Sequence, residues 1–538
     1  MKRLITITLL FYYLLGHSQV FFSNVYKVPE DKTGLTNYFP NWLSSVFPTD
    51  SLIFAFGYSA DTTYKDIFGT AFYMFDWKGS LLDYYHIKDD SLHNFFYPEG
   101  IHTWDGIVFY TTFNNNYKEQ SILKFNRITR NQEDLIIDNS IIKGGDILRG
   151  NMSVTQDSCL LTASEIAIDS TGFNYKIQVT KINTSGNLIW QKILGRDPGN
   201  GYQNHCFSSY VDKYGDVLIG VGYSDNSGLG WPADYQSLLY KLNNEGESVS
   251  SANSMLSRTG LCYIYDIVEG DNKKIYLLAD YNYNEPQYPY ANRGYGMIQV
   301  LDSAMKFKNS VPLNFAATLY GHAIDNIFDK IVKSNDSKGV IIGGDVSYKE
   351  KVIIFNNSNQ RYDSIEWRHD ILHPIKFDYS LNLLWKKVYR IRNGKDDGYL
   401  YDLKSCPSGG YIIAAASYLD DAKEKYGDPY YMPWLLRVDD DGCLIPGCGT
   451  VSNKELPDSK DKILIYPNPA TNYIVILHSG KEKTHYQIIS AEGKIMDEFY
   501  SFIEGEQIIV PIDDFQPGSY FVKAESKRGG SSEVFIKQ

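Results

Sequence analysis

A short pattern recurs seven times between residues about 40 and 448, and this repetition constrains the fold more than any other feature. In each copy a hydrophobic segment ends in a bulky residue, an Asn or Asp follows, and a turn comes next. Four copies carry Gly three residues after the polar residue, which supplies the positive φ that tight hairpins need. The copies are Phe75-Asp76, Phe125-Asn126, Ile182-Asn183, Leu242-Asn243, Leu301-Asp302, Phe377-Asp378 and Val438-Asp439, and the glycines are Gly79, Gly186, Gly246 and Gly442.

Each copy belongs to a unit of about four predicted strands. One strand precedes the marker strand, another follows it, as at Trp190 and Trp385, and a fourth begins the unit. Seven such units predict an all-β, seven-bladed β-propeller over residues 20–448. Stacking each blade on two neighbours covers its apolar faces, and closing the ring removes exposed ends. Six or eight blades, a stack of β-sandwiches or a β-solenoid are the alternatives.

Two units depart from the pattern. The second is short and has Thr129 in place of the glycine, and the sixth carries extra residues over Ser347–Pro374. An insertion of this kind is expected to form a loop on one face of the ring, where binding sites tend to lie. Trp190 and Trp385 occupy matching places in their units and are predicted to anchor the packing between blades.

The last 77 residues, 462–538, form a different unit. Seven short hydrophobic segments, each bounded by Gly, Pro or Asp, predict a small antiparallel β-sandwich of the immunoglobulin-like kind. Pro467 and Pro469 end its first strand because neither can donate a ladder hydrogen bond. Residues 449–461 are rich in Ser, Lys, Asp and Glu and are predicted to be a linker. We therefore expect the tail to stand apart from the propeller.

This tail contains several ordered motifs, whose residues are Tyr466, Pro467, Asn468, Pro469, Gly493, Gly518, Tyr520 and Lys537. Together they resemble the type A C-terminal sorting domain of the type IX (Por) secretion system of Bacteroidetes. Ser490, and Glu533 with Val534, depart from the usual pattern. The alternative is an ordinary immunoglobulin-like module.

The resemblance implies the route and partners of the protein. The tail would engage the type IX translocon, a sortase-like peptidase would remove it within 449–461, and the cargo would be released or attached to anionic lipopolysaccharide. The repeats before the tail look like the degenerate propeller repeats that often precede such domains, a likeness that implies fold and no activity.

The N-terminus agrees with export. Met1-Lys2-Arg3 is basic, Leu4–Leu15 is apolar but too short to span a bilayer comfortably, and small residues follow. This arrangement predicts a signal peptide over residues 1–19. A membrane anchor is the alternative.

Composition limits the function classes. A net charge of −12 argues against nucleic acid and anionic membrane surfaces as partners. The 44 tyrosines suit carbohydrate or protein contacts. Six cysteines are too sparse for a disulfide scaffold. Cys443 and Cys448 are close enough in sequence for a small-loop disulfide, and a zinc pair is the alternative.

Motifs for known chemistry are weak, so no catalytic, cofactor or metal residue is predicted. His369 and His373 have the spacing of metal ligands on a helix, but Pro374 follows and no helical period surrounds them. Residues 439–442 have the composition of a calcium loop but lack the distal Glu and coincide with a repeat turn.

The sequence thus favours a secreted or cell-surface propeller with a binding or adhesion function and no catalysis. A carbohydrate-active hydrolase or lyase on the propeller face is the alternative, and it would need paired carboxylates that converge near the channel. A quinone-dependent dehydrogenase would need regular Trp repeats, which we do not find.

Overall fold

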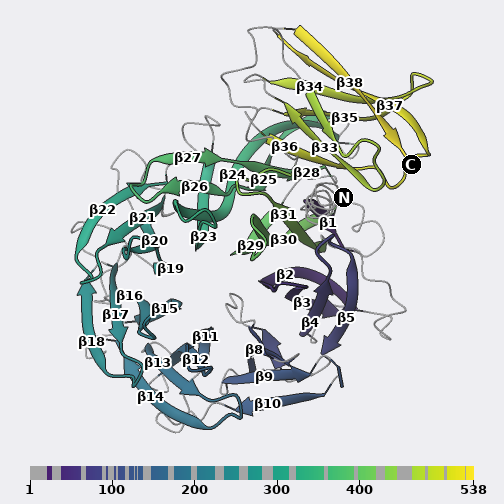
Figure 1. The fold of residues 1–538 in the computed structure, drawn as a ribbon. Helices are drawn as coiled ribbons and strands as arrows, with labels where there is room; N and C mark the ends of the chain where they lie inside the picture. The colour runs from purple at the N-terminus through teal and green to yellow at the C-terminus, as the bar shows by residue number, and fades with distance from the viewer. Residues whose placement is uncertain are drawn as a thin grey trace, which may run out of the picture.

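The structure is a computed structural model, and its described residues form strands and turns without a helix. The description covers residues 21–538 except 27–37, 62–67, 88–91, 95–101, 105–106, 115–119, 127, 130, 137–146, 168–174, 196–202, 225–234, 254–263, 282–294, 314–322, 357–360, 393–397, 420–429, 445–462, 479–482, 502–505 and 528. The predicted signal peptide and the linker 449–461 lie outside these residues. Figure 1 shows the ring of sheets with the C-terminal domain beside it.

Antiparallel sheets arranged around a central axis make up the propeller, and the predicted all-β propeller is confirmed. The described residues give seven such sheets, which agrees with the seven repeat units. The first five are β2–β5 (Tyr38–Pro48, Ile53–Asp61, Phe68–Phe75, Leu81–Ile87), β6–β10 (Leu92–Asn94, His102–Trp104, Ile107–Asn114, Gln120–Asn126, Gln132–Ile136), β11–β14 (Ile147–Val154, Leu160–Ala167, Tyr175–Ile182, Leu188–Leu194), β15–β18 (Gln203–Val211, Val217–Ser224, Tyr235–Leu242, Ser248–Asn253) and β19–β22 (Ile264–Glu269, Ile275–Tyr281, Tyr295–Leu301, Phe307–Pro312).

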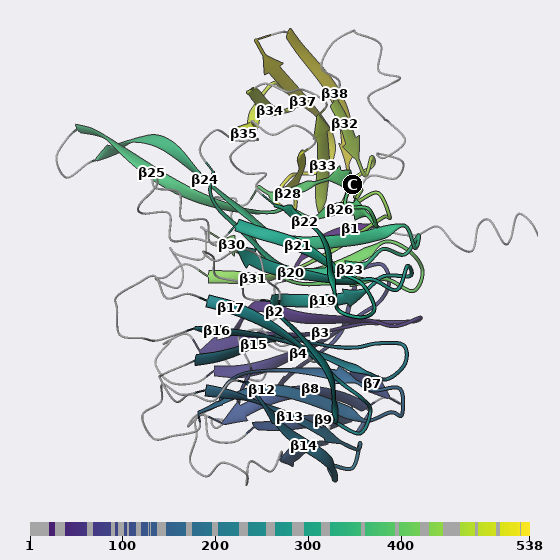
Figure 2. The same ribbon diagram turned by 90° about the vertical axis from the view of Figure 1, so that its left-hand side faces the viewer.

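The sixth blade contains β23 (Ala323–Lys333), β24 (Gly339–Asn356), β26 (Ile375–Asp378) and β27 (Leu383–Lys386). The predicted loop over Ser347–Pro374 is wrong. The second half of β24 instead pairs with β25 (Arg361–Leu372) in register from Asp345↔Leu372 to Asn356↔Arg361. This long hairpin projects beyond the ring in Figure 2.

The seventh blade closes the ring with the N-terminal end of the chain. β29 (Gly398–Ser405), β30 (Tyr411–Leu419) and β31 (Tyr430–Val438) supply three strands, and β1 (Phe22–Val25) pairs antiparallel with β31 as the outermost strand. Phe22 is buried, and the hydroxyl of Tyr26 donates to the Gly79 carbonyl of the first blade at 2.7 Å. The N-terminal strand β1 and the last three strands of the propeller therefore form one blade.

The repeat marker has a clear structural cause. Each marker Asn or Asp turns its Oδ1 onto backbone amides of the turn that follows, as Asn243 does with Glu245 and Glu247 at 3.1 and 2.8 Å. The third residue after the marker adopts positive φ in most copies, and Gly246 has φ of +78°. Of the three copies without glycine, two have Met305 and Leu381 at this place, which adopt φ of +60° and +68° with buried side chains.

The C-terminal domain is a two-sheet sandwich whose seven strands match the predicted segments. One sheet is β32 (Ile463–Tyr466), β33 (Tyr473–His478) and β36 (Glu506–Pro511), and the other is β35 (Ile495–Ser501), β34 (Thr484–Ser490), β37 (Gly518–Ser526) and β38 (Gly529–Lys537). A core that includes Ile474, Ile508 and Tyr486 lies between them.

The expectation that the tail stands apart is wrong. β28 (Val388–Ile391), which connects the sixth and seventh blades, pairs in parallel with β36 and antiparallel with β25 at one point. The sheet of the sixth blade and the first sheet of the sandwich are therefore hydrogen-bonded into one (Figure 1). The reason is that β33 and β36 are apolar on both faces, and a two-sheet sandwich can cover only one of them.

Candidate functional site

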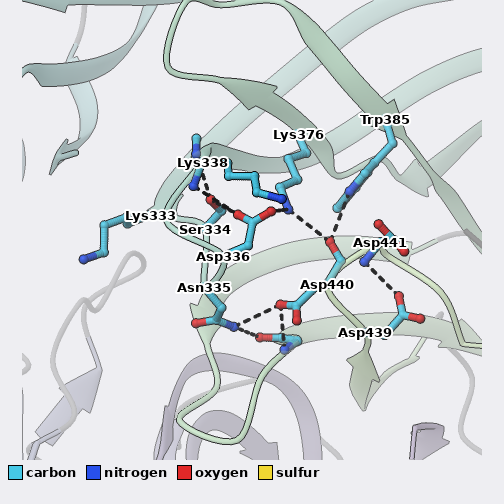
Figure 3. Close-up of polar contacts among 12 residues, drawn as sticks. Lys333, Ser334, Asn335, Asp336, Lys338, Lys376, Trp385, Asp439, Asp440 and Asp441 are labelled. Atoms are coloured by element: carbon cyan, nitrogen blue, oxygen red, sulfur yellow. Dashed lines mark hydrogen bonds and ion pairs between the residues drawn. The ribbon is translucent and has the colours of Figure 1, made fainter. Parts of the chain in front are cut away.

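Polar contacts between blades lie at the turns that follow the marker residues, and Figure 3 shows the set between the sixth and seventh blades. The ammonium of Lys376 is 3.0 Å from Oδ2 of Asp336 and donates to the Asp440 carbonyl at 3.3 Å. Trp385 Nε1 donates to the same carbonyl at 3.2 Å. Burial disfavours ionisation of Asp336, but its hydrogen bonds from Ser334 and Lys376 leave its pKa below the ordinary value.

The same arrangement joins the third and fourth blades. Lys181 Nζ lies 2.7 Å from Oδ2 of Asp157 and 2.7 Å from Oδ1 of Asn244, and Trp190 Nε1 donates to the Asn244 carbonyl at 2.9 Å. Gly246 leaves the space that the Trp190 ring fills. Trp190 and Trp385 thus anchor blade packing as predicted, and these clusters are structural.

A cavity of about 500 Å³ lies where the innermost strands of six blades end. Ser45, Ser153, Ser209, Lys333, Lys404 and Ser405 contribute its polar lining together with Asp266 and Asp402. Val154, Tyr210, Ile267 and Val332 contribute part of the apolar lining. β2, β11, β15, β19, β23 and β29 each contact the innermost strand of a neighbouring blade, so the cavity is one mouth of the central channel.

The carboxylates of this cavity are engaged in joining blades. Asp402 accepts from its neighbour Leu403 at 2.9 Å and from Val46 of the first blade at 2.9 Å. Asp266 likewise accepts from Ile267 and, on the next blade, from Ile331, both at 2.8 Å. Both side chains are buried. Each carboxylate therefore satisfies backbone amides at a blade boundary, where an unpaired amide would be costly.

The cavity also contains a hydroxyl without a protein partner. Ser45 Oγ is buried and has no hydrogen bond within the described part of the chain. Ser153 and Ser209, by contrast, join their hydroxyls across two blades at 2.9 Å. Lys404 lies 3.2 Å from Oδ1 of Asp402 and keeps about a third of its side chain exposed. The mouth thus presents the partly exposed Lys404 side chain to a ligand.

The weak motifs of the sequence have structural roles. Asp439 accepts from the amides of Asp441 and Cys443 at 3.0 and 2.7 Å, as a marker residue does. His373 is fully buried after β25, and its Nδ1 lies 2.8 Å from the Lys387 carbonyl. Burial lowers the pKa of His373 to about 4, against the hydrogen bond to Lys387. No group of three or more His, Cys, Asp or Glu that could hold a metal occurs among the described residues.

Cys443 is disulfide-bonded, and its partner lies outside the described residues, so the pairing with Cys448 stays a prediction. Cys159, Cys206 and Cys406 are buried thiols.

The proline-rich start of the tail fastens the first sheet of the sandwich to its last strand. Asn468 Nδ2 donates to the Val534 carbonyl at 2.9 Å, and its Oδ1 accepts from the Ile536 amide at 3.1 Å. Ala470 continues this contact with a parallel bridge to Lys537. Tyr466 ends β32, and Pro467 and Pro469 flank Asn468. The Asn468 side chain therefore makes the hydrogen bonds to the β38 backbone that a neighbouring strand would otherwise make.

The other sorting-motif residues serve the second sheet. Tyr520 donates its hydroxyl to the Gln516 carbonyl at 2.7 Å and stacks on Phe535 at 5.4 Å between ring centres. Gly518 opens β37 opposite Lys537. Gly493 has φ of +85° in the turn between β34 and β35. The structure therefore brings Asn468, Gly518 and Lys537 together at one end of β38 and places Gly493 in a separate turn.

Sequence reasoning missed the residues that join the tail to the propeller, foremost Gln507, Tyr473 and Arg390. A signal existed only for Tyr473, which begins the uninterrupted apolar run over 473–477, a pattern typical of a strand buried on both faces.

The fold defines this protein as a β-propeller with a C-terminal β-sandwich. The family model described as the secretion system C-terminal sorting domain matches residues 464–538. The C-terminal part of the chain is therefore a sorting domain of the type IX (Por) secretion system, and the protein is exported to the cell surface or secreted. Its tail accordingly interacts with the type IX secretion machinery.

Solved structures similar to this chain have low sequence identity. A protein of unknown function from Dyadobacter fermentans is 11% identical with a TM-score of 0.40, covering 77% of this chain and 97% of that one. The β-propeller domain of the Trilobed protease from Pyrococcus furiosus is 9% identical with a TM-score of 0.40, covering 77% and 98%. The comparison with curated proteins found no match. The described residues contain no helix able to cross a membrane.

Proposed function

We propose that the propeller is a secreted or cell-surface binding module without catalytic activity, and that it takes a glycan with acidic groups at the mouth of its central channel. The supporting observation is that the carboxylates of the cavity bind backbone amides, whereas Lys404 is partly exposed. Asp266 and Asp402 each use both oxygens on backbone amides, while the Lys404 ammonium, 3.2 Å from Asp402 Oδ1, belongs to a side chain that is about a third exposed at the mouth. A hydrolase or lyase needs a carboxylate poised for proton transfer, and these two serve structure.

The tail gives this module its destination. We propose that a sortase-like peptidase cuts the exported chain within residues 449–461, and that the propeller is then released or attached to anionic lipopolysaccharide. The predicted signal peptide over residues 1–19 and the sorting domain at 464–538 support this route.

A glycan panel with acidic and neutral members, probed with the purified chain from residue 20 onward, tests the binding proposal. We expect binding to acidic glycans, and Lys404→Gln to weaken it about tenfold, the loss of one charge-assisted hydrogen bond of about 1.5 kcal/mol. Lys213→Gln is the matched control, because Lys213 forms an exposed ion pair with Glu269 at 3.6 Å outside the cavity. Equal binding by both variants, or turnover of any glycan, would contradict the proposal.

A further inference from the structure

The tail presents an apolar surface to the propeller as well as to its own core. Along β33 and β36, Ile474, Ile476, Ile508 and Val510 lie in the core of the sandwich. The residues between them, Val475 and Ile509, lie in a second core whose other members include Tyr389, Trp434 and Leu444 of the propeller, with Tyr473 and Leu477 packed against it. A tail on a loose tether would expose this second face to water at a cost of about 25 cal/mol per Å².

Backbone pairing adds to this apolar contact. β28 runs parallel to β36 from Val388↔Glu506 to Ile391↔Ile509. The Arg392 amide donates to the Ile509 carbonyl at 2.7 Å and extends the ladder. An edge strand of one domain that continues the sheet of another is the β-augmentation mode of recognition, in which main-chain hydrogen bonds give affinity and side-chain pockets give specificity.

Gln507 supplies the specificity. It is fully buried, its Oε1 accepts from the Leu444 amide at 2.8 Å, and its Nε2 donates to the Gly442 carbonyl at 2.9 Å. The amide therefore pairs with both backbone groups of the segment from which the linker departs. Such a buried side chain needs both partners, and losing them leaves two polar groups unpaired.

Two further polar contacts surround this centre. Arg390 of β28 lies 3.6 Å from Oε1 of Glu506 with both side chains nearly buried, and it donates to the Tyr500 carbonyl at 3.1 Å. The Tyr473 hydroxyl accepts from the Ser23 amide of β1 at 3.3 Å. The tail therefore touches the connector between blades six and seven, the end of β31 and the strand that closes the ring.

We propose that the propeller carries a docking site for its own sorting domain, and that the two remain a noncovalent complex after the linker is cut. The site consists of β28, residues 442–444 and the outer edge of blade seven, and its occupant is residues 462–538. This inference does not depend on what the channel cavity binds. It implies that the docked tail meets other molecules through its second sheet, where Phe521, Val534 and Ile536 are exposed.

Cutting the linker tests the proposal because it removes the effective concentration that the tether provides. A specific protease sequence replaces residues 452–458 of the full chain, the purified protein is cut, and size-exclusion chromatography with mass spectrometry follows at about micromolar concentration. We expect the two pieces to elute together. Separation of the cut pieces at that concentration would overturn the proposal.

Matched variants identify the surface. Ile509→Asp places a charge in the propeller-facing core while its neighbours Ile508 and Val510 keep the sandwich core, and we expect the cut pieces to separate. Phe521→Asp makes the same change on the second sheet, where the side chain is 45% exposed, and the complex should persist.

Gln507→Ala is a second test of the same surface, which remains informative if the Ile509→Asp variant misfolds. It should weaken the cut complex at least about tenfold, since it leaves the buried Leu444 amide without its partner. The Gly442 carbonyl loses one of its two hydrogen bonds and keeps the one from the Tyr389 hydroxyl. Circular dichroism of the released tail reports whether the sandwich stays folded. Identical behaviour of Ile509→Asp and Phe521→Asp, with both tails folded, would also refute the docking site.

Discussion

At the residue scale, polar side chains in this protein hydrogen-bond to backbone groups. The buried Asp402 and Asp266 link blades and the buried Gln507 links domains, whereas the exposed Asn468 bonds to the backbone of β38 at the edge of the sandwich. Each of the three buried side chains contributes about 1 kcal/mol net or more, and its removal costs more because a buried backbone group loses its partner. The sequence shows that these residues are polar but does not show their hydrogen-bond partners, because the partners are distant in sequence.

His373 gives a pH dependence at this scale. Its pKa is lowered to about 4 in the folded protein, whereas an unfolded chain has the ordinary value of 6.5. The unfolded state therefore binds more protons between these values, and stability falls as the pH drops from about 6.5 to 4. The loss is on the order of 3 kcal/mol at pH 4.

Urea denaturation between pH 7 and pH 4 measures this effect, with His373→Asn as the comparison because its amide can still donate to the Lys387 carbonyl. We expect the variant to lose less stability over this range than the original protein. Parallel pH profiles for the two proteins would show that His373 is not responsible.

At the scale of single elements, the turn after each third strand determines how neighbouring blades fit. The marker side chain caps the turn, and in the fourth and seventh blades the glycine at positive φ, Gly246 or Gly442, lies against Trp190 or Trp385 of the preceding blade. Glycine occupies the positive-φ position in four copies, while Met305 and Leu381 show that burial of a large side chain can offset the strain of about 1–2 kcal/mol.

Substitutions at two glycines of the fourth blade distinguish the cost of backbone strain from the cost of disturbed packing. A methyl group on Gly246 would lie 2.7 Å from Cδ2 of Trp190, whereas one on Gly215 would meet nothing closer than 3.9 Å, and both have positive φ. We expect Gly215→Ala to cost about 1 kcal/mol and Gly246→Ala at least about 2 kcal/mol more, since Trp190 must move. Chemical denaturation of the two variants measures the difference. Equal losses would mean that Trp190 is not fixed by this contact.

At the scale of the whole molecule, two long-range pairings complete the architecture. β1 joins the last blade and closes the ring, and β28 joins the tail to the propeller. Ring closure makes the stability of every blade depend on the last one, because each blade buries its faces against two neighbours.

Phe22 tests ring closure. It lies near the predicted start of the mature chain yet is 3% exposed. We expect Phe22→Ala to destabilise the propeller by about 3–5 kcal/mol, as a core residue does. Phe521→Ala is the control, with an expected effect within about 0.5 kcal/mol, because its side chain is largely exposed. Thermal unfolding measures both, and a small effect of Phe22→Ala would mean that the ring holds without β1.

The sequence by itself determined the all-β class, the repeat units and the sorting domain, because these depend on local patterns. A strand with its turn shows in hydrophobic runs and in an Asn or Asp before Gly, and the sandwich shows in its ordered motifs. The long β24–β25 hairpin was not predicted, because a strand pair that covers no core of its own needs no regular hydrophobic pattern. Its sequence therefore resembles that of a loop.

Tertiary structure alone decided which surfaces meet. The channel cavity exists because six strand ends from residues 45 to 405 converge, and their side chains carry no mutual signal along the chain. The contact of Gln507 with residues 442 and 444 likewise joins backbone groups that any sequence possesses. Local pattern can show that the faces of β33 and β36 are both apolar, but only the folded molecule shows that the propeller covers the second one.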